Sequence, residues 1–438
     1  MQDLQNREIK SEAQTRAVLI GIVTRDADLQ AVESGLDELE RLLDTAGGVA
    51  FARVVQSKDT PDPRTLIGSG KVQEIAELCK NNDIDLVVTD EDLSPAQIRN
   101  LEDDIGNDVR VIDRSMLILD IFARHAVTGE GKLQVELAQL RYTAPRLIGK
   151  GTQLSRLGGG IGTRGPGESK LESDRRHIQR RITALEAQLS EMEKNRMTMR
   201  ASRDKSGLPK VAIVGYTNAG KSTLLNRMTD AGILAQDKLF ATLDPTTRKF
   251  ELPGGESILL TDTVGFIRKL PHHLIKAFRS TLDEAVYADI LVIVIDASDP
   301  EHEQQLEVTE QVLCDLGAAG KPTLYVFNKC DLVEGALPTV SGRSAEHQAH
   351  ISALTGQGYE KFAQELESMI HAGKARVTFV IPNAKQGALN TLYRFATVED
   401  VEYGADAVKV TAVVDAKVRG MLREFDPAAS AKKPDWED

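Results

Sequence analysis

One run of residues has the types and spacing needed to bind phosphate. Four apolar residues, Val211 to Val214, predict a buried strand, and residues 215–222 then fit the pattern GxxxxGK[ST]. A helix-like run follows at once, and this strand–loop–helix setting is what makes the pattern specific. The alternative is a chance match in a glycine-containing turn. The strand before the motif and the helix after it argue against a chance match. The predicted phosphate-binding residues are Gly215, Tyr216, Thr217, Asn218, Ala219, Gly220, Lys221, Ser222 and Thr223.

The chemistry of this motif follows from its residue types. Glycines let the backbone N–H groups point at phosphate oxygens, at a helix N-terminus whose dipole favours negative charge. Lys221 can reach the terminal phosphates, and the hydroxyl of Ser222 can ligate Mg²⁺. A second motif, DxxG, comprises Asp262, Thr263, Val264 and Gly265, and it follows a predicted strand at 257–261. There the carboxylate of Asp262 would hold the Mg²⁺ shell through water, and the N–H of Gly265 would lie near a γ-phosphate.

A third motif identifies the base. Asn328, Lys329 and Asp331 end the apolar strand 323–327 as NKxD. The Asp331 carboxylate can accept two hydrogen bonds, from the ring N–H and the exocyclic amine of guanine, and adenine presents no such pair of donors. A fourth segment, with Ser352, Ala353 and Leu354, fits an accessory base-binding loop. Four motifs in this order predict a GTP-binding domain and argue against an ATPase.

Two positions bear on the hydrolysis mechanism. Phe266 follows the DxxG motif where many GTPases carry a glutamine that orients the attacking water. An apolar side chain cannot do so, hence the hypothesis that intrinsic hydrolysis is slow and that a large partner accelerates it. Asn218 lies inside the phosphate loop, where an asparagine can help to hold K⁺ near the phosphates. The alternative for Asn218 is a purely loop-stabilising role.

The first switch segment, residues 239–248, lies between the phosphate loop and DxxG. In such segments a threonine closes over Mg²⁺ and the γ-phosphate. Thr242, Thr246 and Thr247 are all chemically able to do this, and the residues alone do not choose between them.

The N-terminal part alternates strands and helices, which predicts an α/β layer with a largely parallel sheet. Strands are expected at 17–23, 49–55, 85–89 and 109–112, with helices from Leu29, at 70–80, at 95–101 and, behind a serine cap, at 115–124. Gly68-Ser69-Gly70-Lys71 is a possible second nucleotide site. It has Thr65 where the full pattern needs glycine, Val72 in place of a metal-binding hydroxyl, and no long apolar strand before it. We therefore favour a glycine-rich helix start that binds no nucleotide.

A helical hairpin is predicted ahead of the GTP-binding domain. Leu133, Leu137 and Leu140 mark one helix, and a stripe from Leu171 to Met199 with coiled-coil-like spacing marks a second. The connecting loop, 149–167, is glycine-rich and contains no acid, and its cations are Lys150, Arg156 and Arg164. Such a loop can lay positive charge and bare backbone along a phosphate chain, so RNA contact is preferred over a plain flexible linker.

Composition narrows the function classes. The 438 residues carry a net charge of −12, but residues 141–181 contain ten Lys/Arg against three Asp/Glu, so basic character is concentrated near the hairpin. The three cysteines, Cys79, Cys314 and Cys330, are isolated and lack metal-ligand spacing, as expected for reduced thiols in the cytoplasm. No stretch is long enough for a membrane span, and the first residues lack the apolar core of a secretion signal.

The motif order and three sequence runs resemble the HflX family, bacterial ribosome-associated GTPases. These runs are FATLDPTTR, DTVGFI and GGGIGTRGPGESKLE, and the resemblance extends from about residue 17 to 425. It implies Mg²⁺ at Ser222 and Thr242 and a nucleotide contact formed by Phe240, Ala241, Thr242, Leu243 and Asp244. It also implies binding to the 50S subunit, with the hairpin tip near the 23S rRNA of the peptidyl-transferase region, and splitting of stalled or stress-inactivated 70S ribosomes. Family members are also associated with ATP use and RNA remodelling by the N-terminal domain, where this chain has no full ATP motif.

The predicted architecture is an α/β chain of four parts and a tail. These are an N-terminal α/β domain (1–130), a hairpin (131–204), a P-loop domain with a mostly parallel sheet (205–372), a small C-terminal α/β domain (373–425) that contacts a ribosomal protein, and a disordered tail (426–438). We expect a monomeric, cytoplasmic GTPase whose catalytic residues are Lys221, Thr242 and Gly265. The alternatives are a GTPase that assembles 50S precursors, and a nucleotide-dependent RNA-remodelling protein.

Overall fold

The computed structural model describes most of the chain as two compact units. The first unit comprises residues 1–193, 234–245 and 264–282, and the second comprises 194–233, 246–263 and 283–438. No helix among the described residues is long and apolar enough to cross a membrane. The described residues are 14–25, 28–106, 108–147, 166–204, 207–229, 239–240, 243, 245–271, 274, 279–340, 347–372, 374–385 and 387–427.

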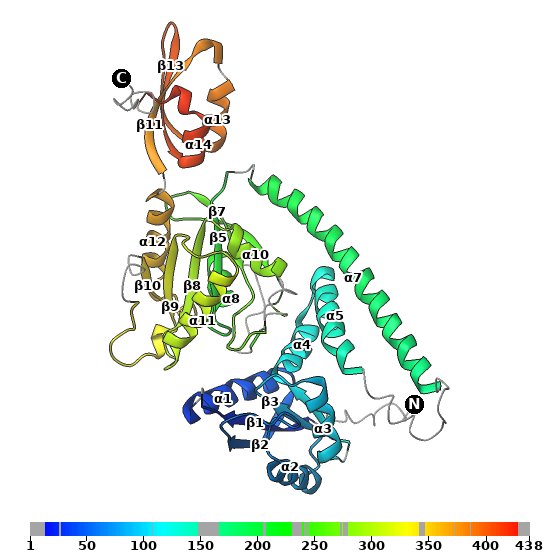
Figure 1. The fold of residues 1–438 in the computed structure, drawn as a ribbon. Coiled ribbons are helices and arrows are strands. Elements are labelled where there is room, and N and C mark those ends of the chain that lie inside the picture. Colours follow the sequence, from blue (N-terminus) through cyan, green and yellow to red (C-terminus); the bar gives the residue numbers. More distant parts are fainter. Residues whose placement is uncertain are drawn as a thin grey trace, which may run out of the picture. The chain divides into compact units, whose positions relative to one another are not determined.

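The first unit begins with the predicted parallel sheet. Its strands run in the order β2-β1-β3-β4, all parallel (Figure 1). Apolar residues of β1 such as Val18 and Ile20 pack with Ile75 and Leu101 from two of the helices. The strands are β1 (Thr15–Val23), β2 (Gly48–Ser57), β3 (Leu86–Thr89) and β4 (Arg110–Asp113), and the helices are α1 (Leu29–Thr45), α2 (Ser69–Asn82), α3 (Pro95–Ile105) and α4 (Arg114–His125).

The predicted N-cap of the fourth helix is wrong. The fourth helix is not capped by Ser115, because α4 already begins at Arg114 and the Asp113 carboxylate accepts the N–H of Met116 at 2.9 Å. The Ser115 hydroxyl instead donates to Asp92 at 2.5 Å. An aspartate at a strand end that leads directly into a helix is the better cap, since it is already extended at the N-cap position.

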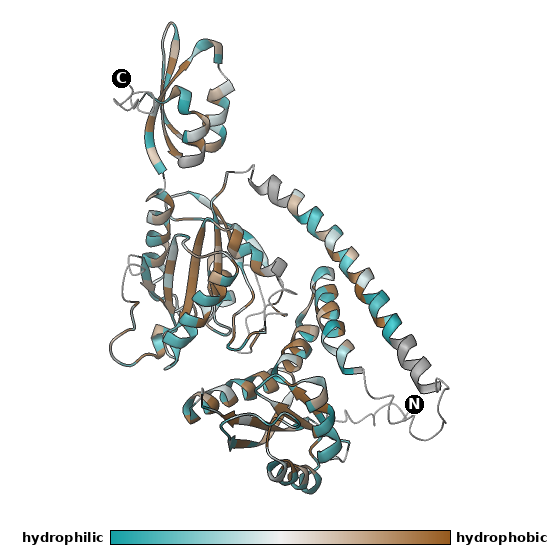
Figure 2. Cartoon of the chain, viewed as in Figure 1, coloured by the Kyte–Doolittle hydropathy of each residue, from teal (hydrophilic) through white to brown (hydrophobic). Residues whose placement is uncertain are grey.

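The predicted helix seam is present from Ile178 to Leu189, while Leu171 and Met199, the ends of the predicted stripe, are not among the residues whose side chains the structure describes. The hairpin consists of α5 (Gly129–Thr143), the 3₁₀ turn η1 (Ala144–Leu147) and α7 (Pro166–Asp204). Ion pairs flank the apolar seam, from Arg141 to Glu186 at 2.7 Å and from Arg181 to Glu136 at 2.6 Å. Between residues 175 and 198, the part of α7 outside this seam is largely hydrophilic (Figure 2). The residues that form the seam are Leu133, Leu137, Leu140, Ile178, Ile182, Leu185 and Leu189.

The second unit contains a six-stranded sheet in the order β10-β9-β8-β5-β7-β6. All its pairings are parallel except β6–β7, which is antiparallel at the edge. This confirms the mostly parallel P-loop fold, although the edge strand β6 was not predicted. The strands are β5 (Lys210–Gly215), β6 (Thr246–Glu251), β7 (Ser257–Asp262), β8 (Ile290–Asp296), β9 (Thr323–Asn328) and β10 (Gln348–His350), and the helices are α8 (Lys221–Thr229), α10 (Arg279–Tyr287), α11 (His302–Asp315) and α12 (Tyr359–Ala372) with the 3₁₀ turn η2 (Cys330–Leu332).

The C-terminal part of this unit is a three-stranded antiparallel sheet in the order β11-β13-β12. The small α/β domain predicted here has three strands, and the charged residues of one of them, β12, hide its strand pattern in the sequence. Asp426, assigned to a disordered tail, is 1% exposed and accepts a bond from Arg419 at 2.8 Å, so it belongs to the fold. The elements are β11 (Lys374–Pro382), η4 (Asn383–Lys385), α13 (Gly387–Phe395), β12 (Thr397–Tyr403), β13 (Ala407–Asp415), α14 (Ala416–Met421) and η5 (Arg423–Phe425).

Candidate functional site

The loop between β5 and α8 depends on two glycines. Gly215 has φ +144°, and a Cβ there would lie 2.3 Å from the carbonyl oxygen of Val294 in the neighbouring strand β8. Gly220 has φ +93°, and a Cβ there would lie 2.1 Å from the Asn328 side-chain nitrogen. Any larger residue would therefore be strained and would also clash. These are the features that a phosphate loop needs, a tight turn packed against a buried sheet.

Lys221, at the start of α8, is buried. It is 6% exposed, and its Nζ donates to the carbonyl oxygen of Tyr216 within the same loop at 2.7 Å. Burial lowers the pKa of Lys221 to about 8, and the negative charge of Asp262 opposes that shift. A cation held at the loop in this way is available for a phosphate, whose charge would stabilise the ammonium form.

Ser222 and Asp262 bring two hard oxygen donors together. The Ser222 hydroxyl donates to Oδ2 of Asp262 at 2.7 Å, and Asp262 is fully buried at the end of β7. Across the described part of the chain, no cluster of three or more His, Cys, Asp or Glu could hold a metal ion by itself. A hydroxyl and one carboxylate fit Mg²⁺, which usually takes few protein ligands and completes its shell with water and phosphate. The residues present therefore suit the expected ion.

The base-recognition residues are also tied to the loop. Asn328, 2% exposed, donates from Nδ2 to the Ala219 carbonyl at 2.8 Å, and its Oδ1 accepts the N–H of Ala353 at 2.9 Å. One side chain thus joins the phosphate loop to the accessory loop. Asp331 is exposed in η2, so its carboxylate can meet a ligand.

Two supporting residues were missed by the sequence analysis. Arg227 of α8 donates to the carbonyl oxygens of Leu354 and Thr355, both at 3.2 Å, and so fixes the accessory loop. Asp296, at the end of β8, forms an ion pair with Lys329 at 2.6 Å. An acid that ends an apolar strand could have signalled Asp296, whereas nothing in the pattern of α8 distinguishes Arg227.

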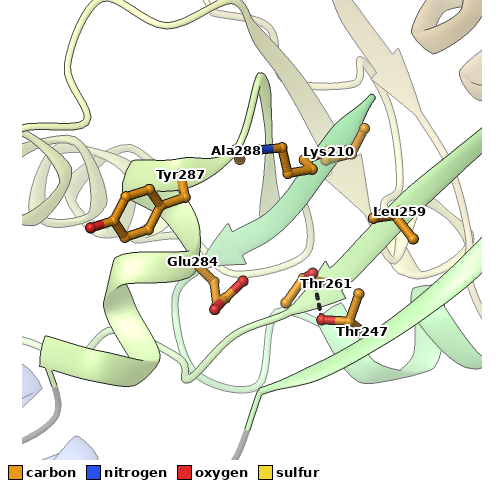
Figure 3. Close-up of a pocket in the computed structure, with 8 residues that line it drawn as sticks. Lys210, Thr247, Leu259, Thr261, Glu284, Tyr287 and Ala288 are labelled. Atoms are coloured by element: carbon orange, nitrogen blue, oxygen red, sulfur yellow. Dashed lines mark hydrogen bonds between the residues drawn. The ribbon is translucent and has the colours of Figure 1, made fainter. Parts of the chain in front are cut away.

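The structure narrows the choice among the switch threonines. Thr246 and Thr247 lie in β6 and pair with β7, and the hydroxyl of Thr247 forms a hydrogen bond with that of Thr261 at 3.0 Å. That pair lines a cavity of about 20 Å³, together with Lys210, Glu284 and Tyr287 (Figure 3). The cavity has room for about one water molecule and not for a nucleotide.

The remaining switch residues are divided between described and undescribed positions. Ala241, Thr242 and Asp244 lie outside the described residues, so Thr242 stays a prediction. Leu243 is 2% exposed. Phe240 is also 2% exposed, and its ring meets that of Phe122 in α4 edge-on, with centroids 4.7 Å apart.

The second motif continues into the first unit. Asp262 and Thr263 belong to the second unit, and the Thr263 hydroxyl donates to the Ile213 carbonyl of β5 at 2.8 Å. Val264 and Gly265 belong to the first unit and are buried, as is Phe266 at 1% exposure. A side chain so buried cannot orient water at a surface, which agrees with the expectation for Phe266.

The predicted RNA-binding cations Lys150, Arg156 and Arg164 lie outside the described residues. On α7, Arg175 and Arg180 are exposed. Arg181, which ends the basic stretch 141–181, pairs with Glu136 across the hairpin seam. Part of the positive charge of α7 therefore serves the hairpin itself.

Comparisons with known proteins agree with these motifs. Three family profiles match: "GTP-binding GTPase N-terminal" at residues 33–123, "GTP-binding GTPase Middle Region" at 125–203 and "50S ribosome-binding GTPase" at 210–329. A GTPase HflX of Lacrimispora saccharolytica is 49% identical, over 94% of this chain and 96% of the relative. GTPase HflX of Escherichia coli is 44% identical, over 89% and 90%. A solved GDP complex of a GTP-binding protein from Sulfolobus solfataricus is 26% identical over 81% of this chain and 98% of that one, with a TM-score of 0.44.

Proposed function

The chain belongs to the HflX family of GTPases, and on that premise we propose that it binds the 50S subunit and splits stalled or stress-inactivated 70S ribosomes. GTP hydrolysis would govern its release. The main support is one combination of features, a guanine-nucleotide site whose loops are tied together by Asn328 and a helical hairpin whose loop carries Lys150, Arg156 and Arg164. A polyanion such as 23S rRNA is the partner that such a loop fits. The protein would then act in the cytoplasm, where ribosomes are.

The nucleotide site supports a division of roles among its residues. Lys221 would hold the terminal phosphates, Ser222 and Thr242 would ligate the metal, and Asp262 would reach it through water. Mg²⁺, when bound, neutralises charge on the β- and γ-phosphates. The N–H of Gly265 would meet the γ-phosphate.

Base recognition would depend on four residues. Asp331 would accept two hydrogen bonds from guanine, while Asn328 keeps the phosphate loop and the accessory loop in register. Ser352 and Ala353 would border the base; Ser352 is 1% exposed, and its Oγ accepts the N–H of Thr355 at 3.1 Å.

Water positioning is the step that these residues do not supply. Phe266 has no group that can accept a proton or a hydrogen bond, so the attacking water must be ordered by the backbone, by a bound ion or by a partner, and the hypothesis here is a large partner. We therefore expect slow hydrolysis by the protein alone and faster hydrolysis on 50S subunits. Equal rates with and without 50S subunits would contradict this role of the partner.

Asn218 supports a proposal about a second cation. It lies within the phosphate loop at φ +61°, where its side-chain oxygen can contribute to a K⁺ site beside the phosphates. Turnover should then be faster in K⁺ than in Na⁺ at equal ionic strength. Equal turnover in the two salts would leave Asn218 the loop-stabilising role alone.

The splitting proposal is tested by sedimentation. Purified 70S ribosomes are mixed with the protein and a non-hydrolysable GTP analogue, and run on a sucrose gradient. Dissociation into 50S and 30S subunits, with the protein on the 50S peak, is the expected result. Intact 70S ribosomes without bound protein would contradict it, and binding to 50S precursors without splitting would favour an assembly role.

A variant with Arg156→Glu and Arg164→Glu tests the hairpin loop in the same gradients. Reversing two charges should weaken 50S binding and make the remaining binding less dependent on salt. Lys71→Glu serves as a control, because this lysine pairs with Glu74 on the surface of α2 and lies in no part of the chain proposed to contact the 50S subunit. Unchanged 50S affinity in the double variant would argue against RNA contact by the loop.

A further inference from the structure

Both switch segments contact the N-terminal domain within the first unit. Lys269, four residues after Gly265, donates from Nζ to Asp90 Oδ2 at 2.6 Å and to Glu91 Oε1 at 2.5 Å. Its neighbour Arg268 donates to the hydroxyl of Ser34 in α1 at 2.6 Å. A GTPase switch is thus attached to another domain of the same chain by charged contacts.

The attachment reaches a buried charge network. Asp90 is 3% exposed and follows directly on β3. It also accepts a bond from Arg114 at 2.6 Å, and Arg114, 2% exposed, pairs in turn with Glu38 of α1. Burial alone would raise the pKa of Asp90, but the cations of Arg114 and Lys269 lower it below its usual value. Asp90 is therefore a buried carboxylate that Lys269 helps to neutralise.

The packing around Asp90 leaves little room for adjustment. A Cβ on Gly35 of α1 would lie 2.8 Å from Asp90 Oδ2. Movement of Lys269 would consequently alter the surroundings of α1 as well as those of Asp90, because these groups are close-packed.

The switch residues at these contacts also share an unusual backbone. Lys269 has φ +51° and Phe240, which meets Phe122, has φ +58°. Non-glycine residues adopt this left-handed region infrequently, and they remain there when surrounding contacts hold them. In each switch segment, then, a residue with strained backbone contacts the N-terminal domain.

We propose that Lys269 is a positioning residue that couples the second switch, and with it Gly265, to the N-terminal domain through Asp90 and Glu91. The inference rests on the proposed role of Gly265 at the γ-phosphate. In this proposal, a nucleotide that moves the segment containing Gly265 also changes the Lys269 contacts, because both residues belong to one short segment. By thermodynamic linkage, a change in those contacts must then alter the preference of the protein for a triphosphate over a diphosphate.

Charge reversal tests the coupling in the full chain. The measured quantity is the ratio of affinities for a non-hydrolysable GTP analogue and for GDP, both with Mg²⁺. Lys269→Glu places a third negative charge beside Asp90 and Glu91, and should change this ratio by at least about 5-fold, the lower end of common coupling strengths. Adding Glu91→Lys restores one opposite-charge pair and should return the ratio to within about 2-fold of the wild-type value.

The control is Lys71→Glu, which makes the same charge change at the exposed Lys71–Glu74 pair of α2. It should leave the ratio unchanged. Lys269→Met, which has no charge to repel, covers the possibility that Lys269→Glu fails to fold, and it should shift the ratio in the same direction by a smaller factor. A wild-type ratio in both Lys269 variants, or no recovery in the double variant, overturns the coupling. Failure of the wild-type chain to bind GDP would instead contradict the proposed nucleotide site.

Discussion

The helix starts of α8 and α2 both carry a glycine–lysine sequence, and they are built differently. At α8, Gly220 has φ +93° and Lys221 is buried behind a glycine loop that follows the strand β5. At α2, Gly68 is an extended N-cap with φ −68°, and a Cβ on Gly70 would meet nothing within 4 Å. Lys71 there pairs with Glu74 on the surface at 2.7 Å.

The difference shows what converts such a sequence into a phosphate site. The first turn needs its glycines because backbone and side chains approach closely, and it holds its lysine inside the loop. In the second turn a larger residue would fit at Gly70, and Lys71 forms an ion pair with Glu74. The geometry therefore supports a nucleotide site at the start of α8, and the absence of a second site at α2 stays a prediction.

The largest expected difference between the turns concerns their lysines. Lys221→Met should weaken binding of Mg-GDP by at least about 100-fold, because a buried charge facing phosphate is lost. Lys71→Met should change binding by less than about 2-fold, since the Lys71–Glu74 pair is exposed. Calorimetric titration measures both. Similar losses of affinity in the two variants would contradict a difference in function between the two turns.

A second contrast uses the glycines. Gly220→Ala should lower the free energy of unfolding by about 2–4 kcal/mol, from backbone strain and a clash with Asn328, and abolish nucleotide binding. Gly70→Ala should raise it by up to about 1 kcal/mol, because alanine favours the helix and has space. Urea denaturation of both variants gives these values. A harmless Gly220→Ala would contradict the close packing of the loop.

Specificity for guanine should depend on Asp331, at the nucleotide site of the α8 loop. Asp331→Asn replaces an acceptor oxygen by an amide donor, which suits the C2 carbonyl of xanthine better than the amine of guanine. Affinity for GDP should fall about 100-fold, while affinity for xanthosine diphosphate rises above it. Competition binding with the two nucleotides measures the change. Retained preference for guanine in the variant would assign recognition to other groups.

The smallest expected effect is a pH dependence of stability. The pKa of Lys221 is lowered to about 8 in the folded chain, from about 10.4 in an unfolded one. Between these values the unfolded state binds more protons, so Lys221 makes stability rise with pH there, by at most about 1.4 kcal/mol per unit. Below pH 8 this contribution to the slope vanishes, because both states are protonated.

Urea denaturation at pH 7.5 and 9.5 measures the contribution of Lys221. Over this interval the free energy of unfolding should rise by about 1–2 kcal/mol more in the wild-type chain than in Lys221→Met. Lys71→Met should follow the wild type, since it leaves Lys221 in place. An identical gain in Lys221→Met would contradict the burial of the charge.

Much of the fold could be predicted because its signals are local. Buried parallel strands are continuous apolar runs, so β1, β3, β5 and β9 were predicted, and the NKxD and phosphate-loop motifs indicated the order of the site residues. The edge strand β6 was missed because its sequence, TTRKFE, is polar and was assigned to a switch. Edge strands face solvent and lose the apolar pattern.

Contacts made across long sequence separations could not be predicted. Arg227 supports a loop more than a hundred residues away, and Lys269 meets Asp90 across a similar distance in sequence. No periodicity records such pairs, because they depend on how finished elements pack. For the same reason, the sequence could not choose among Thr242, Thr246 and Thr247 as the metal-binding threonine. The pairing of β6 with β7 shows that Thr246 and Thr247 are strand residues.

Titration of the full chain with Mg-GDP is the most direct test of the central claim, that a single guanine site is formed by the loop at Gly215–Ser222. One nucleotide should bind per chain, and binding should be lost in Lys221→Met and retained in Lys71→Met. Two nucleotides per chain, or undiminished binding in Lys221→Met, would contradict it.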